Sequence, residues 1–586
     1  MVVTIPNQIQ SESPITNYNG VQYKTSSSVS YYLGFRGIIT RNLTVMIPQK
    51  EGQVNNDLVS TMSSSSDRPQ NPLCVDNIKE SSLQLILLWS CLAGSFVIMY
   101  ILHRFHATWF PESIGVLLLG VIVGVFCRYV VPATWGVEVV TQLDPGIFFS
   151  FFIPAIIFDA GYTLDRGDFF GNIGGIILYA VVGTVISSIV VACGLYILGQ
   201  YGVSLELGFV ECFMFGALIS AVDPVATLAI FCALGVPPTL HYLVFGESIV
   251  NDAVAIVLFE TFEKFKYATQ DDLLQVSFLG LLQFCYVSVG SILVSIVFCV
   301  ISAFIFKYSA LRHTPKLEMG IFFVIAYLSY LVSLPYLSGI MTILTSGILM
   351  SHYSLPNLSK QSSVAIMGTS NSLAMICETL TFLYTGFALF AFDNNQWHIP
   401  FVCFTILFCL IGRFLNIIPL TGILNLYRTN KIGFKYQFIM WFSGLRGAIA
   451  FALAIGLRSD PKGEYIFTAT LATVFFTIIF LGGGTYPILK GLKVQKSTEV
   501  GAVLPKKDHW LVNLDDKYFQ RWFIREDVLA EMRAAEEQAL KDYQEKQKER
   551  EEEKLAEIVV DNGSKSSIQE SESIELMTTH NDSEEK

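Results

Sequence analysis

Apolar runs of nearly bilayer-spanning length recur along this chain, and no other feature restricts its fold as strongly. They begin at Leu83 and end at Leu492, and most approach the roughly 20 residues that an α-helix needs to cross hydrocarbon. Backbone groups inside a bilayer must be hydrogen-bonded within their own segment, so such runs fold as helices. We predict an all-α polytopic membrane protein with about thirteen transmembrane helices. The predicted spans are residues 83–103, 113–131, 146–160, 174–198, 208–234, 240–262, 276–306, 317–332, 336–351, 364–392, 400–420, 436–457 and 464–492.

Polar residues are concentrated at the two ends of the chain and divide it into three predicted parts. Residues 1–82 are rich in Ser, Asn and Gln, and we expect a disordered extracytoplasmic segment. Residues 83–495 would form the transmembrane domain. Residues 496–586 would form a cytoplasmic regulatory tail with a charged helix at about 526–557, able to bind regulatory proteins or to be phosphorylated. Only 15% of all residues are charged, against about 25% in soluble domains.

Charge and cysteine placement exclude several function classes. The net charge of −11 comes largely from the acidic tail, and no basic patch is present, so we expect no nucleic-acid partner. Most of the 11 cysteines lie within or beside apolar spans, without CxxC or Cys/His ligand spacing. We therefore expect no zinc site, no disulfide framework and no cofactor. The first residues lack a charged and then apolar pattern, so no cleavable signal peptide is expected.

Basic residues in the short loops predict the orientation of the chain in the membrane. With the tail in the cytoplasm and an odd number of spans, the N-terminus lies on the extracytoplasmic side. The cytoplasmic loops then hold Arg104, Arg166, Lys307, Arg312, Lys316, Lys360, Arg428, Lys431 and Lys435, against only Lys264, Lys266, Arg458 and Lys462 opposite. In this orientation Asn42, in the sequon Asn42-Leu43-Thr44, is a candidate glycosylation site.

Several ionisable or amide side chains interrupt the apolar spans, where such groups are rare and usually face a cavity or a partner. Each of them is therefore a candidate functional residue. They are Asp159, Asp223, Glu247, Asn251, Asp252, Glu378, Arg413 and Arg446.

The segment FGESIVNDA in the sixth span presents two acids in different directions. Glu247 and Asn251 are four residues apart and share a helix face, whereas Asp252 is turned by about 140° from Glu247. A buried guanidinium needs a fixed carboxylate, so we expect Arg413 to pair with Glu247. Asp252 would then face an aqueous cavity.

Two spans carry helix interruptions at matching places. Asp223-Pro224 interrupts the fifth span, because proline removes a backbone donor, and Gly444 and Gly447 bracket Leu445-Arg446 in the twelfth. These spans correspond if spans 1–6 repeat as spans 8–13. Broken helices at corresponding positions of inverted repeats indicate the midplane site of a transporter.

A carboxylate in such a site can bind either a proton or a hard alkali cation, for which oxygen atoms are the preferred ligands. If both need Asp252, the binding of one expels the other, which predicts secondary antiport rather than enzymatic catalysis. Two alternatives stay open at this point. One is a cation channel, although a repeated filter loop is missing. The other is an intramembrane aspartyl enzyme that uses Asp223 and Asp252, which lie on adjacent spans.

Several long motifs in the same order make the chain resemble the eukaryotic sodium/proton exchangers of the monovalent cation:proton antiporter family (CPA1). The resemblance covers roughly residues 83–495. The motifs are FFIPAIIFDAGY, ISAVDPVATLAIF, LVFGESIVNDAVAIVL, LSGIMTILTSGILMSHY, ICETLTFLYTG, IGRFLNIIPL and MWFSGLRGAIAFAL.

The resemblance implies electroneutral exchange of Na⁺, or K⁺, for H⁺ by a homodimer with crossed, unwound fifth and twelfth helices. It implies that Asp252, Asn251, Asp223 and Ser248 bind the proton and the transported cation, with Asp252 and Asn251 as the direct cation ligands. It also implies a structural or gating role for the remaining charges, Glu247, Arg413, Arg446, Asp159 and Glu378. Asn rather than Asp at position 251 goes with one-for-one exchange without net charge movement in such proteins.

The resemblance further implies a location in Golgi, endosomal or apical plasma membrane. Two residues depart from the pattern of the family. Ala155 stands where the family has a second proline, which affects the bending of the third span. Ser333 replaces an acid before LSGI, so amiloride-type sensitivity is not implied.

Overall fold

The computed structural model describes most of the chain between residues 72 and 535. The described residues are 15–18, 21–25, 46–48, 72–105, 109–129, 145–164, 166–223, 225–266, 273–391, 396–428, 431–458, 460, 462–492, 515–535, 537, 538, 541 and 545. Asn42 and most of the predicted helix at 526–557 lie outside the described residues, although residues 526–535 are helical.

Three short strands lie in the N-terminal part of the chain, which forms a unit of its own ending at Ile78. They are β1 (Ile15–Tyr18), β2 (Val21–Thr25) and β3 (Met46–Pro48), in the antiparallel order β1-β2-β3. In the register, Tyr18 pairs with Val21 and Thr25 pairs with Met46.

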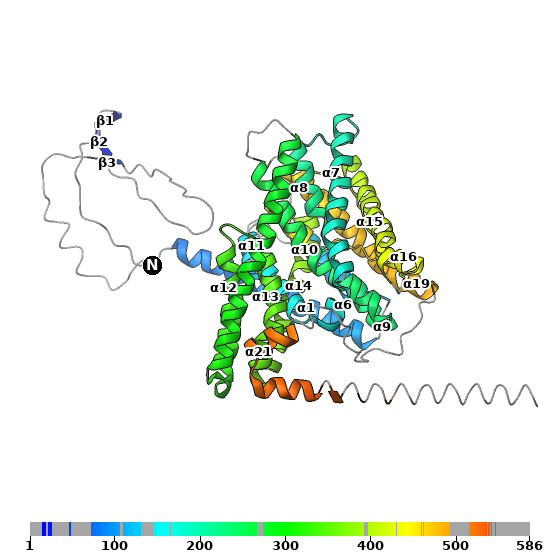
Figure 1. Cartoon of the computed structure of the whole chain (residues 1–586). Helices are drawn as coiled ribbons and strands as arrows, with labels where there is room; N and C mark the ends of the chain where they lie inside the picture. Colours follow the sequence, from blue (N-terminus) through cyan, green and yellow to red (C-terminus); the bar gives the residue numbers. More distant parts are fainter. Residues whose placement is uncertain are drawn as a thin grey trace, which may run out of the picture. The chain divides into compact units, whose positions relative to one another are not determined.

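In the second unit, residues 79–586, every described element is a helix, as the apolar spans predict, and the first of them begins at Pro72, before the unit boundary. Figure 1 labels most of the helices. In chain order they are α1 (Pro72–Arg104), α2 (Glu112–Tyr129), α4 (Pro145–Ile147), η4 (Phe148–Phe152), α5 (Ile153–Tyr162), α6 (Arg166–Ile177), η5 (Leu178–Gly183), α7 (Thr184–Gln200), α8 (Phe209–Ser220), α9 (Val225–Leu234), α10 (Pro238–Phe265), α11 (Leu273–Tyr308), η6 (Leu311–His313), α12 (Pro315–Ser333), α13 (Gly339–Tyr353), η7 (Leu355–Asn357), α14 (Lys360–Ala391), α15 (Ile399–Tyr427), α16 (Phe434–Phe442), α17 (Ala448–Gly456), α18 (Gly463–Phe476), η8 (Thr477–Gly482), α19 (Gly483–Gly491), η9 (Asp515–Phe519) and α21 (Gln520–Phe523).

Nine helices in the described part of the chain are long and apolar enough to cross a membrane. The other four predicted spans do not reach that length as single helices. The third and ninth are short, and the fifth and twelfth are each broken into two halves, α8 with α9 and α16 with α17. The all-α membrane fold and the two broken helices are confirmed, whereas the count of thirteen crossings stays a prediction.

The membrane helices pack in two groups. In the first bundle, α14 packs on α2, α5 and α12, and α13 packs on α5, α11 and α12. In the second bundle, α8 packs on α7 and α10, α15 packs on α7 and α18, and α17 packs on α8 and α18. Figure 1 shows α11, α12 and α13 on the left and α7 and α15 on the right. Direct contacts of α10 with α5 and α13, and of α14 with α17, join the bundles.

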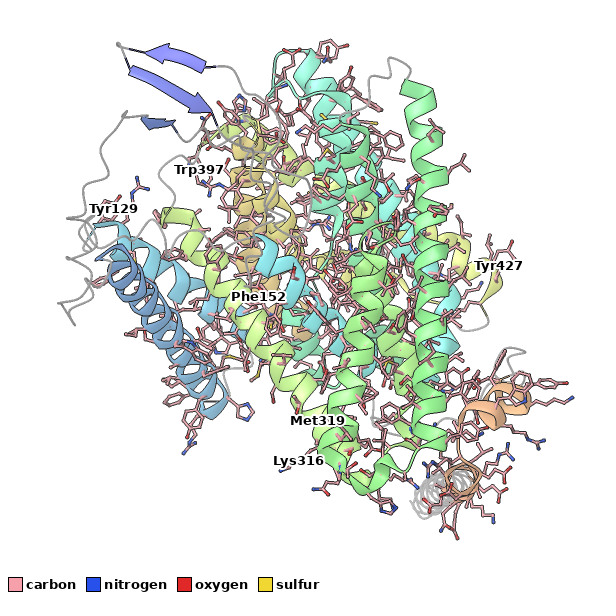
Figure 2. The ribbon with its side chains drawn as sticks, turned by 90° about the vertical axis from the view of Figure 1, so that its left-hand side faces the viewer. Tyr129, Phe152, Lys316, Met319, Trp397 and Tyr427 are labelled. Carbon is pink, nitrogen blue, oxygen red and sulfur yellow. The ribbon has the colours of Figure 1, made fainter. Side chains whose placement is uncertain are left out.

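Apolar side chains cover much of the outer surface of the helices, as expected for contact with lipid. On α11, for example, Val289, Leu293 and Val297 follow one another at helical spacing and are all more than half exposed. Figure 2 shows side chains projecting from the helices along their length, with Trp397 toward one end of the bundle and Lys316 at the other.

Candidate functional site

The break in the fifth predicted span leaves backbone carbonyls that accept hydrogen bonds from side chains elsewhere in the chain. Helix α8 ends at Ser220, and α9 begins at Val225. The Ser220 and Ala221 carbonyls accept hydrogen bonds from Arg446 Nη1 at 2.7 and 3.1 Å. The Val222 carbonyl accepts one from Ser248 Oγ at 2.6 Å. The end of a helix leaves such carbonyls without an intrahelical partner, and burial makes an external donor necessary.

The break in the twelfth predicted span crosses the break in the fifth. Helix α16 ends at Phe442 and α17 begins at Ala448, and the residues between them contain Arg446. The backbone N–H of Asp223 donates to the Leu445 carbonyl at 3.0 Å. Each break thus donates a hydrogen bond to the other. Arg446 donates to the end of α8, and the backbone of Asp223 donates to Leu445, which follows α16.

Gly447 explains why this crossing can be so close. A Cβ atom at this position would lie 2.0 Å from Asp223 Oδ2, closer than any real contact. Asp223 also lies just before the N-terminus of α9 and against that of α17, where the ends of both helix dipoles favour a negative charge. The sequence pattern predicted the broken helices, and the structure adds that the second one presents its glycine to the carboxylate of the first.

A cavity of about 100 Å³ lies between the two bundles, beside this crossing. Its carboxylates are Asp223 from the break, Asp252 from α10 and Glu378 from α14, and all three side chains are half-buried. A cavity of about 10–15 Å³ already holds one water, so this one has room for a cation together with several waters. The rest of its wall is mostly apolar, including Phe148 from η4 and Phe245 from α10.

Helix α10 separates the predicted site residues by the direction in which they point. Phe245, Ser248 and Asp252 follow one another at intervals of three and four residues and line the cavity. Glu247 and Asn251 share a different face of the helix and are buried, each with 1% of its surface exposed. Ser248 donates its hydroxyl proton to Val222, so its oxygen keeps lone pairs available beside the cavity.

Glu247 forms a two-pronged ion pair with Arg413 of α15. Arg413 Nη1 donates to Glu247 Oε1, and Arg413 Nη2 donates to Glu247 Oε2 at 3.0 Å and to the Met440 carbonyl at 3.0 Å. Asn416, one turn further along α15, approaches the same carboxylate at 3.4 Å. The group joins α10, α15 and α16 within the second bundle, and a charged pair so deeply buried requires this complete set of partners.

Asn251 does not line the cavity. Its Nδ2 donates to the Ser220 carbonyl at 3.2 Å, and its Oδ1 lies 2.7 Å from the Thr184 hydroxyl of α7, which donates to it. Ser220 thereby accepts from both Asn251 and Arg446. The amide oxygen predicted to be a cation ligand is therefore occupied by an internal partner in this conformation.

Asp159 also lies outside the group that lines the cavity. It is buried in α5, and its Oδ1 has no hydrogen-bond partner among the described residues. The structure thus brings together Asp223, Ser248, Asp252 and Glu378 around the cavity, places Arg446 behind it, and leaves Asp159 and the Glu247–Arg413 pair to one side.

Thr184, Asn416 and Thr477 were not predicted from the sequence. Thr477 accepts a hydrogen bond from the backbone N–H of Arg446 at 3.0 Å. Asn416 stands within the motif IGRFLN, one turn after Arg413, and its position was a usable signal. Hydroxyl residues are common in membrane helices and bond within their own helix, so Thr184 and Thr477 carried no such signal.

The described residues contain no group of three or more His, Cys, Asp or Glu side chains that could hold a metal ion. An alkali cation in this cavity would be a transported substrate. Oxygen atoms from Asp252, Asp223 and Ser248 are ligands of the type that Na⁺ and K⁺ prefer.

Comparison with known sequences identifies the family. Residues 93–491 match the sequence profile described as sodium/hydrogen exchanger, transmembrane. The chain belongs to the sodium/hydrogen exchanger family. The exchanger is 42% identical over 425 residues to sodium/hydrogen exchanger 8 of Homo sapiens, which covers 71% of this chain and 73% of that protein. It is 34% identical over 469 residues to sodium/hydrogen exchanger 1 of Dictyostelium discoideum, covering 78% and 68% of the two chains.

The fold of the exchanger is also that of a solved antiporter. The structure of the sodium proton antiporter MjNhaP1 from Methanocaldococcus jannaschii aligns with a TM-score of 0.54 and 18% identity, covering 71% of this chain and 99% of that one. The family predicted from the motifs is therefore confirmed. The similarity of MSHYSLPNLS, HTPKLE and LDDKYFQRWF to the eighth exchanger isoform agrees with the relatives of that name.

Proposed function

We propose that this exchanger is a secondary antiporter in which Na⁺ and H⁺ compete for the carboxylate of Asp252. The observation that carries the proposal is the cavity between the two bundles, with Asp223 and Asp252 contributed by one bundle and Glu378 by the other. Its relatives are named as exchangers, which favours antiport over the channel and the intramembrane enzyme.

The competition follows from the chemistry of a single carboxylate in a confined site. Ionised Asp252 accepts either a proton or a cation, and the other ligands are the oxygens of Asp223 and Ser248 and water. The proton neutralises the charge that the cation needs, so the two cannot be held together. Coupling requires that the loaded carboxylate crosses between the two sides and that the empty, charged one does not.

In this proposal the second bundle moves relative to the first, and the movement exposes the site to one side of the membrane and then to the other. The crossed breaks, Glu247 and Arg413 all belong to the second bundle, so these contacts can move together as one body. Glu378 on α14 belongs to the first bundle and faces the cavity across the interface. We propose that it acts on the transported ion from the static side, as a gating charge.

Electroneutral exchange is the stoichiometry that this site favours. One carboxylate that takes one proton or one monovalent cation carries the same charge in both loaded states. Asn251 keeps the neighbouring position neutral, and it braces the Ser220 carbonyl rather than binding the ion. K⁺ carries the same charge and accepts the same ligands, so it is the second cation to test.

Cellular properties complete the proposal. We propose a homodimer with an extracytoplasmic N-terminus, a glycan at Asn42 and a cytoplasmic tail open to regulatory proteins and phosphorylation. The membranes proposed are those of the Golgi, of endosomes or of the apical cell surface.

The decisive experiment is flux in proteoliposomes that contain the full-length protein. Opposing cation and pH gradients are imposed with Na⁺, K⁺ and Li⁺ in turn, and luminal pH is recorded. We expect Na⁺-dependent proton flux that does not change with an imposed membrane potential. Asp252→Asn should reduce it to the level of protein-free liposomes, while Glu531→Gln, an exposed acid of the tail, should not. Normal flux with Asp252→Asn would refute the assignment of the site.

A further inference from the structure

A short segment of the tail, residues 515–529, is fastened to the ends of α11 and α13. It consists of η9, α21 and the residues that follow, and we call it the strap. Figure 2 shows it in orange at the same end of the molecule as Lys316. The charged helix predicted from the sequence begins within this segment, at residue 526.

Asn357, at the end of η7, holds the strap through its main chain. Its Nδ2 donates to the Phe523 carbonyl at 2.7 Å, and its Oδ1 accepts from the backbone N–H of Arg525 at 2.9 Å. Asn357 is fully buried. A side-chain amide that bonds two backbone groups in this way fixes the direction of the strap where α21 ends.

Arg525 caps α11, and Lys307 of α11 caps α21. Arg525 Nη2 donates to the carbonyls of Phe306 and Ser309 at 3.0 and 2.8 Å, at the C-terminal end of α11. In return, Lys307 Nζ donates to the carbonyls of Arg521 and Trp522 at 3.0 and 2.9 Å, in the last turn of α21. Cations at helix C-termini satisfy otherwise unpaired carbonyls and interact favourably with the helix dipole.

Asp515 fastens the beginning of the strap to the end of α13. Its carboxylate meets His352 Nε2 at 2.7 Å, accepts from the Tyr353 hydroxyl at 2.5 Å, and accepts from Gln520 Nε2 at 2.9 Å. Burial alone would raise the pKa of Asp515. The hydrogen bonds from His352, Tyr353 and Gln520 outweigh it and hold the pKa below its ordinary value.

Apolar contacts close the attachment. The Phe523 ring lies 5.6 Å from that of Phe304 on α11 and 5.2 Å from that of Tyr353 on α13, both edge-to-face. Ile524 and Leu529 are buried, with 1% and 7% of their surfaces exposed. The strap therefore buries apolar side chains and also forms the main-chain hydrogen bonds described above. Both features are those of a segment stably packed on the helices.

We propose that the strap is a brace, which fixes the end of α11 to the end of α13 and so keeps the first bundle rigid during transport. The partners described above that lie outside the strap belong to α11 with the residue that follows it, Ser309, to α13 and to η7. Helix α11 follows α10, which carries Asp252, and packs against it. When the second bundle moves, α11 is the helix that α10 would pull along, and the strap prevents this at its far end.

This inference rests on the proposed exchange function, but its first test does not. Hydrogen–deuterium exchange is measured on the full-length protein in lipid nanodiscs for the wild type, Arg525→Ala and Arg521→Ala. Arg521 is the matched control, because it belongs to the same segment and its side chain is exposed, and within the described part of the chain its contact to α11 uses its carbonyl. We expect protected amides at residues 524–529 in the wild type and in Arg521→Ala, and about tenfold faster exchange in Arg525→Ala, since a charge-assisted contact is lost.

The second test is transport by the same variants in proteoliposomes. The maximal rate should fall about threefold or more in Arg525→Ala, because only part of the rigidity of the bundle is lost. The half-saturating Na⁺ concentration should stay unchanged, because the cavity is not touched. Arg525→Lys, which keeps one donor to α11, should give intermediate values in both measurements and serves if the alanine variant does not fold.

Two results would overturn the proposal. One is exchange at residues 524–529 in the wild type that is as fast as in an unfolded peptide, which would mean that the strap is not docked. The other is an unchanged maximal rate in an Arg525 variant that has lost protection, which would mean that docking has no part in transport. Failure of the wild type to exchange Na⁺ for H⁺ would instead contradict the proposed function and leave the protection pattern readable.

Discussion

Arg446, in the break of one membrane helix, donates a hydrogen bond of 2.7 Å to the carbonyl of Ser220, the last residue before the break of another. The guanidinium thereby supplies what an interrupted helix lacks at its C-terminal end, a donor and a positive charge. The same residue stands two positions from where α17 begins, so one side chain fixes the geometry of both breaks. Asp223 owes its position in the cavity to this crossing.

We predict that Arg446→Gln abolishes most of the exchange activity while the protein still inserts into the membrane. The Ser220 and Ala221 carbonyls would lose a charge-assisted donor, and such bonds stabilise by about 1.5–3 kcal/mol. The Na⁺-dependent flux should fall about tenfold or more, and Arg446→Lys, which keeps the charge and one donor, should retain part of it. Equal flux in the lysine and glutamine variants would contradict the role assigned to the charge.

Gly447→Ala should impair exchange without unfolding the protein. The new Cβ would overlap Asp223 Oδ2, so the carboxylate must leave its place beside the cavity. We expect the half-saturating Na⁺ concentration to rise and the maximal rate to fall. Gly433→Ala is the matched control, since a Cβ there meets no atom within 4 Å and the residue also precedes a half of the same broken helix. Similar kinetics in the two variants would show that the fit of Gly447 against Asp223 is unimportant.

The sequence allowed the membrane fold and the two breaks to be predicted, because hydropathy and proline or glycine placement act locally. Pro224 removes a backbone donor and the glycines around Arg446 lower helix propensity, so both sequences locally favour a break in the helix. Helix periodicity also separated Glu247 from Asp252 correctly, because the angle between two side chains on one helix depends on their spacing alone.

The partners of these side chains were harder to predict, because they depend on how neighbouring helices are rotated. Asn251 was expected to bind the cation, yet its amide is held by Ser220 and Thr184. Backbone carbonyls as acceptors have no sequence signature, so the contact of Arg446 with α8 could not be seen. For the same reason the sequence placed the strap only within a cytoplasmic tail. Its attachment depends on Asn357, which binds the main chain of the strap, and on Arg525, which binds carbonyls at the end of α11.

The Glu247–Arg413 pair should behave as a structural unit. Neutralising either residue leaves the other as a buried, uncompensated charge, which costs about 3–5 kcal/mol. We therefore expect Glu247→Gln and Arg413→Gln each to lower expression and the midpoint of thermal unfolding in detergent. The exchange of the two residues, Glu247→Arg with Arg413→Glu, should recover part of that loss. A double variant no more stable than either single one would refute the pairing as the source of stability.

The attachment of the strap should withstand acidification over the physiological range. Docking lowers the pKa of Asp515. The ionised carboxylate therefore stabilises the docked state fully at every pH above the ordinary carboxyl pKa. This contribution is lost only as the pH falls through the lowered pKa of the docked state. Protection of residues 524–529, corrected for intrinsic exchange, should therefore not decrease between about pH 8 and about pH 5, which lies above the ordinary Asp value of about 3.9.

Asp515→Asn should reduce this protection at every pH, because the amide replaces the charged acceptor shared by His352, Tyr353 and Gln520. Asp527→Asn is the control, since its carboxylate is 65% exposed and meets Arg312 only at 3.4 Å. An exposed pair of this kind contributes little to stability, so protection should stay as in the wild type. Loss of protection between pH 8 and pH 5 in the wild-type protein would contradict the assignment of Asp515 as an ionised anchor of the strap.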